Sequence, residues 1–386
     1  MDFQLSPQEV KLQQELAAFC RNEIAPRAKM LECSSRQERC ALMRENLKML
    51  ARGGCLEAGH AGEAIDLILV YLAGEEIARA CPATFLSARA STFLCAGALR
   101  LLGTLEQKQY YIPALMQAEK VGALAYSEEQ AGSDLSSIHA VARKNGDAWV
   151  ISGMKDIVIN APIADVFLVL AYHDKDAGPE HGLSIFIIEK EAEGLKISDP
   201  LETMGLRGAP IAAISMNNCV AVGLLGGTLG KGKEQVNRLL TLGTVGIAAL
   251  CVGIGTACME ISTDHAKGRT AFGRRIGMYQ DVGFKLADIF TYNDLSRMLA
   301  LRAAWALNTS EHEAEVLAAG AKLFASEAVT KITDWGMQIF AGHGYLAGSD
   351  MERLYRDAKF GEICEGTSEM QRALIARTEL DRFLKP

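Results

Sequence analysis

The sequence predicts a mainly helical protein with a central β domain, and three observations support that fold class. Apolar residues recur at helical spacing through residues 1–120, short β-type runs follow in 121–230, and long helical segments return in 231–386. Two helical blocks of similar size favour packing of these blocks on each other, with the β domain to one side. A chain of 386 residues is long enough for three such domains.

Residues 1–120 are predicted to form an N-terminal helical domain. Ser6, Pro7 and Glu9 make a capping box with proline at the first helical position. Pro26 is expected to end that first helix, because the residue before a proline is disfavoured in helical conformation. Further helices are predicted at 36–53, 63–80, 84–103 and 105–118.

Residues 121–230 are predicted to form a compact, mostly antiparallel β domain. Asn145-Gly146 separates two alternating runs and indicates a hairpin. Short apolar runs bounded by turn residues predict buried strands at 166–171 and 183–188, and 211–222 fits another.

Residues 231–386 are predicted to form an antiparallel helical bundle, with long segments at 233–268, 279–308 and 311–340. The run 245–259 is strongly apolar but shorter than the roughly 20 residues that span a bilayer, so we expect a buried helix there.

Composition narrows the function. A net charge of −7 argues against nucleic-acid binding. The ten cysteines contain no C-x-x-C pair and the seven histidines have no metal-binding spacing, so we expect reduced thiols and no metal. The polar N-terminus, Met-Asp-Phe-Gln, does not resemble a signal peptide, and we expect a cytoplasmic protein without a membrane span.

Glu365 is the candidate catalytic residue. It precedes Gly366, which permits unusual backbone angles, and Ser368 and Gln371 then have capping-box spacing at a predicted helix start. A carboxylate on a loop that leads into a helix is well placed for acid–base chemistry. An ordinary acidic loop is the alternative that these residues alone leave open.

Five motifs occur in order along nearly the whole chain. They are Ser127-Glu-Glu-Gln-Ala-Gly-Ser-Asp134, Arg269-Thr-Ala-Phe-Gly-Arg-Arg275, Gln338-Ile-Phe-Ala-Gly-His-Gly-Tyr345, Arg353-Leu-Tyr-Arg-Asp-Ala-Lys359 and Glu365-Gly-Thr-Ser-Glu369. Together they resemble the acyl-CoA dehydrogenases, a family of FAD-dependent flavoproteins. That resemblance implies an N-terminal helical domain, a middle β-barrel-like domain and a C-terminal four-helix bundle.

The resemblance assigns roles to individual residues. Glu365 matches the base that takes the α-proton of the thioester while the β-hydrogen leaves as hydride to the flavin. Ser133 is implied to touch FAD or the CoA pyrophosphate, and Gly366 to border the substrate. A further set of residues is implied to contact FAD, and some of these are implied to reach the FAD of a neighbouring subunit in a homotetramer. These residues are Leu124, Tyr126, Ser127, Ile157, Ile159, Arg269, Gln280, Gln338, Gly342, Thr367 and Glu369.

Several positions depart from the family pattern. Ile157 and Ile159 replace an aromatic and a hydroxyl residue beside the flavin, which implies altered flavin reactivity. Thr241 and Thr244 replace charged residues that help hold CoA, and they also leave no carboxylate at the family's alternative base position. The stretch Glu57-Ala-Gly-His60 replaces a loop that borders the active site in relatives. Cys364 replaces a tyrosine, and the smaller side chain would enlarge the substrate pocket.

Arg89 lies in an apolar helix in the region that lines the acyl pocket of relatives. A buried arginine needs a partner, so it binds a substrate carboxylate, forms a structural ion pair, or lies at the surface.

The resulting prediction is α,β-dehydrogenation of an acyl-CoA with a short, branched, cyclic or dicarboxylic acyl group. An electron-transfer flavoprotein is the expected acceptor. The alternatives are an enoyl-CoA reductase, a lyase-type acyl-CoA enzyme, or a non-catalytic partner subunit.

Overall fold

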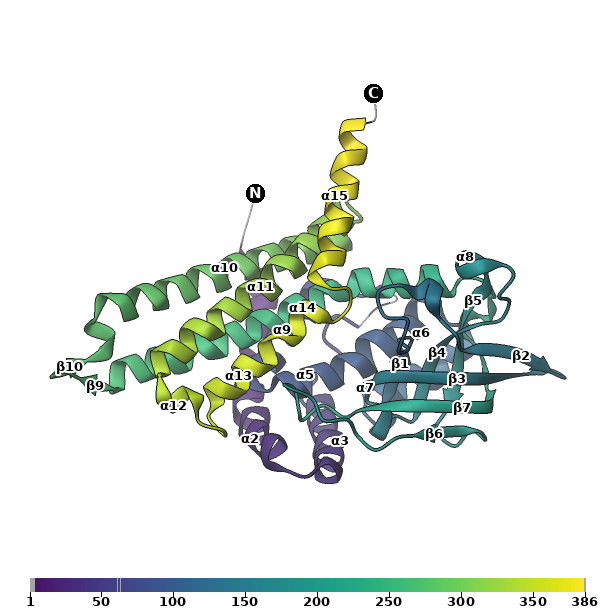
Figure 1. Ribbon diagram of the computed structural model, residues 1–386, viewed down its shortest axis with the longest axis horizontal. Coiled ribbons are helices and arrows are strands. Elements are labelled where there is room, and N and C mark those ends of the chain that lie inside the picture. Colours follow the sequence, from purple (N-terminus) through teal and green to yellow (C-terminus); the bar gives the residue numbers. More distant parts are fainter. Residues whose placement is uncertain (1–3, 61, 63, 385–386) are drawn as a thin grey trace.

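The computed structural model describes residues 4–60, 62 and 64–384, and it has the predicted fold class (Figure 1). Helices come first, an eight-stranded sheet follows, and a bundle of long helices completes the chain. The sheet lies at one end of the molecule, and the bundle extends away from it over the N-terminal helices. The boundaries at 120 and 230 remain predictions from the sequence.

The N-terminal part is a set of helices around α4 (Leu67–Ala80). Its remaining helices are α1 (Pro7–Phe19), α2 (Ala25–Cys33), α3 (Arg36–Arg52), α5 (Pro82–Arg89), α6 (Gly97–Leu102) and α7 (Leu105–Met116). The capping box of Ser6 and Glu9 is present at the start of α1. A seven-residue π-helical segment, η2 (Ala90–Ala96), joins α5 to α6 without a break.

The expectation that Pro26 ends the first helix is wrong. The chain passes from α1 through a π-helical turn, η1 (Cys20–Ile24), directly into α2. The amide of Ala25 donates to the carbonyl of Cys20 at this wider turn. Pro26 lies directly after this wider turn, in the first turn of α2.

One sheet forms the middle part, in the order β6-β7-β3-β2-β4-β5-β8, with β1 paired parallel to β4. The predicted hairpin is confirmed, because Asn145 and Ala148 are register partners; the two turn residues between them are Gly146 and Asp147. The strand β4 is buried along its entire length, as a central strand should be. The strands are β1 (Gly122–Ala125), β2 (Val141–Asn145), β3 (Ala148–Ile159), β4 (Val166–Tyr172), β5 (Leu183–Glu189), β6 (Leu195–Ile197), β7 (Ile211–Ala221) and β8 (Gly223–Leu224).

Three long helices dominate the C-terminal part: α9 (Gly232–Gly268), α10 (Gln280–Asn308) and α11 (Ala314–Phe340). Shorter helices follow, namely α12 (Gly342–Tyr345), α13 (Asp350–Ala358) and α14 (Phe360–Ile363), and α15 (Ser368–Leu384) projects outward from the bundle (Figure 1).

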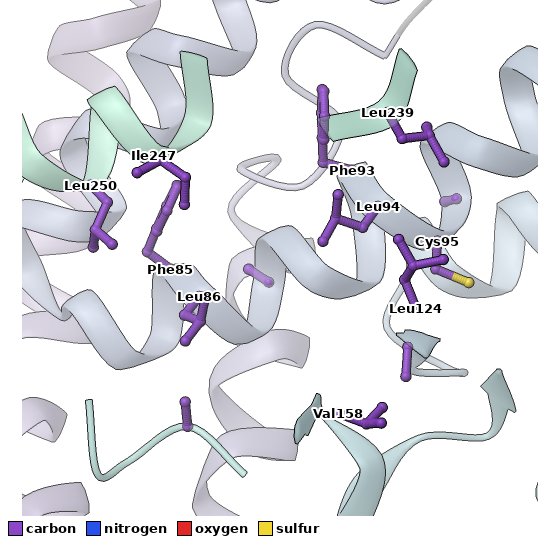
Figure 2. Packing of buried hydrophobic residues seen from close by; sticks show 14 of the residues in the cluster. Phe85, Leu86, Phe93, Leu94, Cys95, Leu124, Val158, Leu239, Ile247 and Leu250 are labelled. Carbon is purple, nitrogen blue, oxygen red and sulfur yellow. The ribbon is translucent and has the colours of Figure 1, made fainter. Parts of the chain in front are cut away.

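The helix α9 is the central element of the core. Two helical segments, Pro82–Leu102 and Gly232–Gly268, are long and apolar enough to cross a membrane, but 83% and 78% of their most apolar windows are buried in the protein. The buried helix predicted at 245–259 is therefore confirmed, although burial rather than length argues against a span. Figure 2 shows Phe85 of α5 pointing toward Ile247 and Leu250 of α9.

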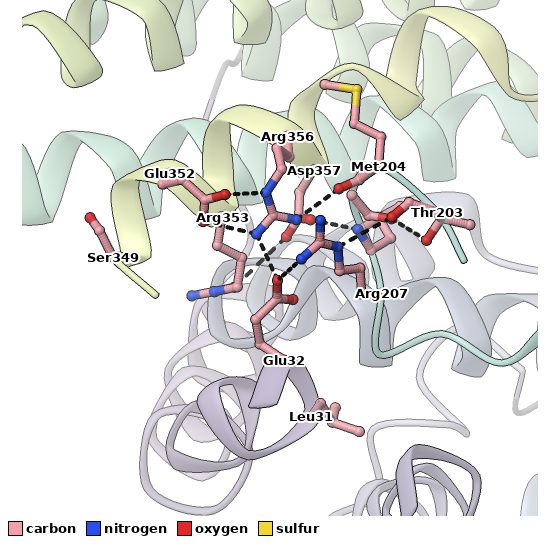
Figure 3. Close-up of polar contacts among 12 residues, drawn as sticks. Leu31, Glu32, Thr203, Met204, Arg207, Ser349, Glu352, Arg353, Arg356 and Asp357 are labelled. Carbon is pink, nitrogen blue, oxygen red and sulfur yellow. Dashed lines mark hydrogen bonds and ion pairs between the residues drawn. The ribbon is translucent and has the colours of Figure 1, made fainter. Parts of the chain in front are cut away.

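A charged cluster ties the three parts of the chain together (Figure 3). Arg356 of α13 donates to Glu32 of α2 at 2.6 Å and to the carbonyl of Met204 at 2.8 Å. Arg207, from the same loop as Met204, also pairs with Glu32 at 3.4 Å. The Arg353–Lys359 motif thus joins a bundle helix to an N-terminal helix and to a loop of the β part.

Candidate active site

Glu365 lies in the short loop between α14 and α15, and its side chain is buried. The residue is only 4% exposed. Its φ is 53° and that of Gly366 is 89°, so two successive residues adopt the left-handed conformation. Glutamate rarely adopts this conformation, and such residues gather at functional sites. The sharp turn lets the carboxylate enter the interior while α15 leads outward (Figure 1).

Lys322 of α11 binds the backbone of this loop. The residue is fully buried, and Nζ donates to the carbonyl of Gly366 at 2.6 Å and to that of Glu362 at 3.4 Å. The partners of this buried ammonium group are therefore backbone carbonyls, and burial lowers the pKa of Lys322 below its ordinary value. The loop that carries Glu365 is fixed by a side chain from the bundle.

The predicted capping box of Ser368 and Gln371 is wrong. The hydroxyl of Thr367 accepts from the amide of Met370 at 3.4 Å, so Thr367 is the residue that caps α15. The Gln371 side chain instead donates to the carbonyls of Glu365 and Gly366, each at 3.3 Å. The two left-handed residues turn these carbonyls toward Gln371, which consequently stabilises the loop rather than the helix end.

Arg89 binds Glu365 through both carboxylate oxygens. Nη1 donates to Oε1 and Nη2 to Oε2, and Nη2 also donates to the carbonyl of Gly243 at 2.8 Å. The two side chains are 4% and 2% exposed. The guanidinium also lies 5.4 Å from the ring centre of Phe93. Among the three possibilities for Arg89, the ion pair is confirmed and the surface position is wrong.

The helix α9 makes room for this pair with two glycines. A Cβ atom on Gly243 would lie 2.3 Å from Oε2 of Glu365, and one on Gly246 would lie 2.3 Å from Nε of Arg89. Any side chain at either position would push the pair apart. Thr244, between them, is buried, and its hydroxyl donates to the carbonyl of Thr241 at 2.7 Å within the helix. CoA contacts of Thr241 and Thr244 remain a prediction.

The end of β1 and the middle of β3 form a second wall near Glu365. Burial raises the pKa of Tyr126 well above its ordinary value, and the nearby charge of Glu365 adds to this. Lys155 of β3 is fully buried and donates to the carbonyl of Tyr126 at 3.1 Å. Ile157 of β3 is 63% exposed and Ile159 is half-buried. An exposed apolar surface therefore lies beside the strand end that carries Tyr126.

The other residues predicted near the flavin differ in how exposed they are. Leu124 is buried in β1, Ser127 and Thr367 are half-buried, and Ser133 and Glu369 are exposed. The hydroxyl of Ser368 is buried, and the carboxylate of Glu327 in α11 lies close to it.

A separate group of predicted residues lies at the opposite end of the bundle. Arg269 directly follows α9, Gln280 begins α10, and Gln338 and Gly342 lie near the end of α11 and at the start of α12 (Figure 1). Gln338 lines a cavity of about 250 Å³ there. Within one chain the structure does not bring these residues to Glu365, and Phe272 beside them is 97% exposed.

Sequence reasoning missed Lys322, Gly243 and Gly246. A single lysine in the apolar segment Ala318 to Val329 could have indicated a buried cation. The glycines gave no usable signal, because glycine within a helix also occurs where it contacts nothing, as at Gly320.

Fold and site together define the class of three-part oxidoreductases that hold a flavin beside a β domain and a helical bundle. The chain belongs to the acyl-CoA dehydrogenase family. Residues 6–119 match the acyl-CoA dehydrogenase N-terminal domain, 123–219 its middle domain and 230–380 its C-terminal domain.

Individual relatives agree with this assignment. The chain is 36% identical over 383 residues to a probable acyl-CoA dehydrogenase of Bacillus subtilis, covering 98% of this chain and 99% of the relative. A 3-(aryl)acrylate reductase of Clostridium sporogenes is 35% identical over 303 residues, which is 78% of this chain and 80% of the relative.

Solved structures share the fold across their length. A glutaryl-coenzyme A dehydrogenase in complex with glutaryl-CoA has a TM-score of 0.91 at 30% identity, with 99% of this chain and 97% of that chain covered. A structure concerning the electron transferring flavoprotein of Acidaminococcus fermentans also gives 0.91 at 30% identity, with 98% and 100% covered.

Proteins of this family depend on FAD, and the residues of this chain fit that cofactor. The exposed face of Ile157 suits the flat apolar flavin ring. The bound flavin supplies the hydride acceptor of the reaction, and the protein supplies position and electrostatics.

Proposed function

We propose that this protein dehydrogenates a short acyl-CoA whose acyl group ends in a carboxylate. Glu365 takes the α-proton of the thioester, and Lys322 and Gln371 hold its loop in place. Arg89 binds the carboxylate at the far end of the acyl group. The observation that supports this choice is the buried ion pair between Arg89 and the proposed base.

The argument rests on charge balance in a buried site. When Glu365 takes a proton, Arg89 loses its counter-charge, and an uncompensated buried charge costs about 3–5 kcal/mol. The buried Lys322 adds a second positive charge close by. A carboxylate on the acyl group would stay beside Arg89 and balance its charge during proton transfer. A plain alkyl group offers no such compensation.

The test is anaerobic bleaching of the bound flavin by a panel of thioesters. Glutaryl-CoA should bleach the flavin at least tenfold faster than valeryl-CoA, which has the same chain length without the terminal carboxylate. The variant Glu365→Gln should bind FAD but bleach with neither thioester. Equal bleaching rates for both thioesters would refute the preference, and full activity of Glu365→Gln would refute the assignment of the base.

The remaining features of this proposal concern assembly and electron flow. Arg269, Gln280, Gln338 and Gly342 contact the FAD of a neighbouring subunit in a homotetramer, which agrees with their distance from Glu365 in one chain. The protein is cytoplasmic and passes electrons to an electron-transfer flavoprotein. A particle mass equal to four chains, one bound FAD per chain, and loss of FAD in the variant Gln338→Ala would support this assembly. A monomer with full FAD content would refute it.

Reduction of an enoyl thioester is the second candidate. The likeness to a 3-(aryl)acrylate reductase favours it, as do Ile157 and Ile159, which change the flavin surroundings. Rapid reoxidation of the reduced flavin by enoyl thioesters, without bleaching by any saturated thioester, would identify this activity.

A further inference from the structure

A small cavity adjoins Arg89. Its volume is about 40 Å³, and its lining includes Phe85, Arg89, Phe93, Gly246 and His60. A single water needs roughly 10–15 Å³ on this scale, so the cavity has room for a group of a few atoms. The lining is apolar except at Arg89, His60 and Thr92, and Thr92 uses its hydroxyl to bond the carbonyl of Ala88 at 2.9 Å.

His60 is the unusual member of this lining. The residue is 7% exposed, and its Nδ1 has no hydrogen-bond partner among the residues that the structure describes. Burial, with a contribution from the charge of Arg100, lowers the pKa of His60 to about 4, so the imidazole is neutral near pH 7. A neutral imidazole carries one N–H donor and one acceptor nitrogen. A buried polar nitrogen without a partner is costly, so a bound group that satisfies it should gain affinity.

Arg89 also retains unused donors toward this cavity. A guanidinium has five N–H groups, and the bonds to Glu365 and Gly243 use three of them, one on Nη1 and two on Nη2. One N–H on Nη1 and the one on Nε remain. Nε lies against Gly246, which also lines the cavity. Arg89 can therefore bind a second anion without releasing Glu365.

We propose that His60 determines specificity for the far end of the acyl group, by donating a hydrogen bond to a terminal carboxylate that the cavity holds between His60 and Arg89. This inference rests on the proposed function and extends it, because it names the residue that completes the carboxylate site. His60 does not contact the reacting carbons, so its effect should fall on recognition rather than on proton abstraction.

The experiment compares His60→Leu with wild type on glutaryl-CoA and valeryl-CoA, using the FAD-loaded protein. Removal of a hydrogen bond to a charged group should lower kcat/KM for glutaryl-CoA about tenfold or more, mainly through KM, and leave valeryl-CoA within about twofold. His60→Gln retains an N–H donor and should recover part of the loss. His312→Leu, at an exposed histidine, is the matched control and should change neither substrate.

Binding provides a second measurement that does not depend on turnover. The dissociation constant of glutaryl-CoA, from anaerobic spectral titration, should rise in His60→Leu by the same factor as KM. Equal losses on both thioesters would overturn the inference, because His60 would then serve packing alone. An unchanged preference in both His60 variants would overturn it too. A wild-type protein that responds to neither thioester would refute the proposed function itself, which is a distinct result.

Discussion

Replacing Arg89 with methionine should destabilise the protein strongly, because it leaves Glu365 buried without its partner. The Arg89 and Glu365 side chains are 4% and 2% exposed, so solvent cannot replace the lost contact. Breaking a buried pair from one side costs about 3–5 kcal/mol, and the carbonyl of Gly243 also loses a donor. Total stabilities are about 5–15 kcal/mol, so the loss should be a large fraction of the whole.

A double-mutant cycle measures the interaction directly. Arg89→Met and Glu365→Met should each cost about 3–5 kcal/mol, whereas the double variant should cost no more than either single one, because an apolar pair replaces the ion pair. The assay is urea unfolding at fixed protein and FAD concentration, since bound FAD shifts apparent stability. The exposed pair Lys231 and Glu234 serves as the control and should show no measurable coupling. The reasoning would be refuted if the double variant lost, within about 0.5 kcal/mol, the sum of the free energies of unfolding that the two single variants lose.

Three further predictions follow from the same site. Lys322→Met should lower kcat about tenfold or more and leave KM and FAD content nearly unchanged, because the carbonyl of Gly366 loses a charged donor; a KM effect alone would contradict this. Gly243→Ala should abolish flavin bleaching, because its Cβ would lie 2.3 Å from a carboxylate oxygen, whereas Gly320→Ala, with nothing within 4 Å, should be fully active. As pH falls from 6.5 to 4, the free energy of unfolding of wild type should fall by about 3 kcal/mol more than that of His60→Leu, because protonation of His60 favours the unfolded chain. The free energies come from urea unfolding at each pH, and the same pH dependence for both proteins would contradict the prediction.

The sequence predicted elements well where a local pattern determines them. The Asn145-Gly146 hairpin and the buried strand β4 follow from turn chemistry and from a continuous apolar run. Prediction failed where the backbone departed from regular geometry. A π-helical turn carries the first helix past Pro26, and two left-handed residues move the cap of α15 from Ser368 to Thr367. Gly366 indicated unusual backbone angles at the second site, but no residue pattern indicated the π-helical turn or the left-handed conformation of Glu365.

The Arg353–Lys359 motif illustrates a different limit. The sequence showed that this motif resembles the family, but it did not show which residues the motif contacts. Arg356 contacts Glu32, which is 324 residues away in the sequence, and the carbonyl of Met204 (Figure 3). Burial raises the pKa of Asp357, next to it, to about 6. Only the fold reveals that this motif joins the three parts of the chain.

The candidate site was predictable in its base but not in its electrostatics. Arg89 and Glu365 are separated by 276 residues, and local sequence gives no information on which buried charges meet. The glycines at 243 and 246 make the meeting possible, because they remove every side chain that would occupy the space of the guanidinium and the carboxylate. A guanidinium that is held this closely and keeps two N–H donors unused is the basis for our proposal of a substrate with a terminal carboxylate. The candidate base alone does not distinguish such a substrate from a plain alkyl thioester.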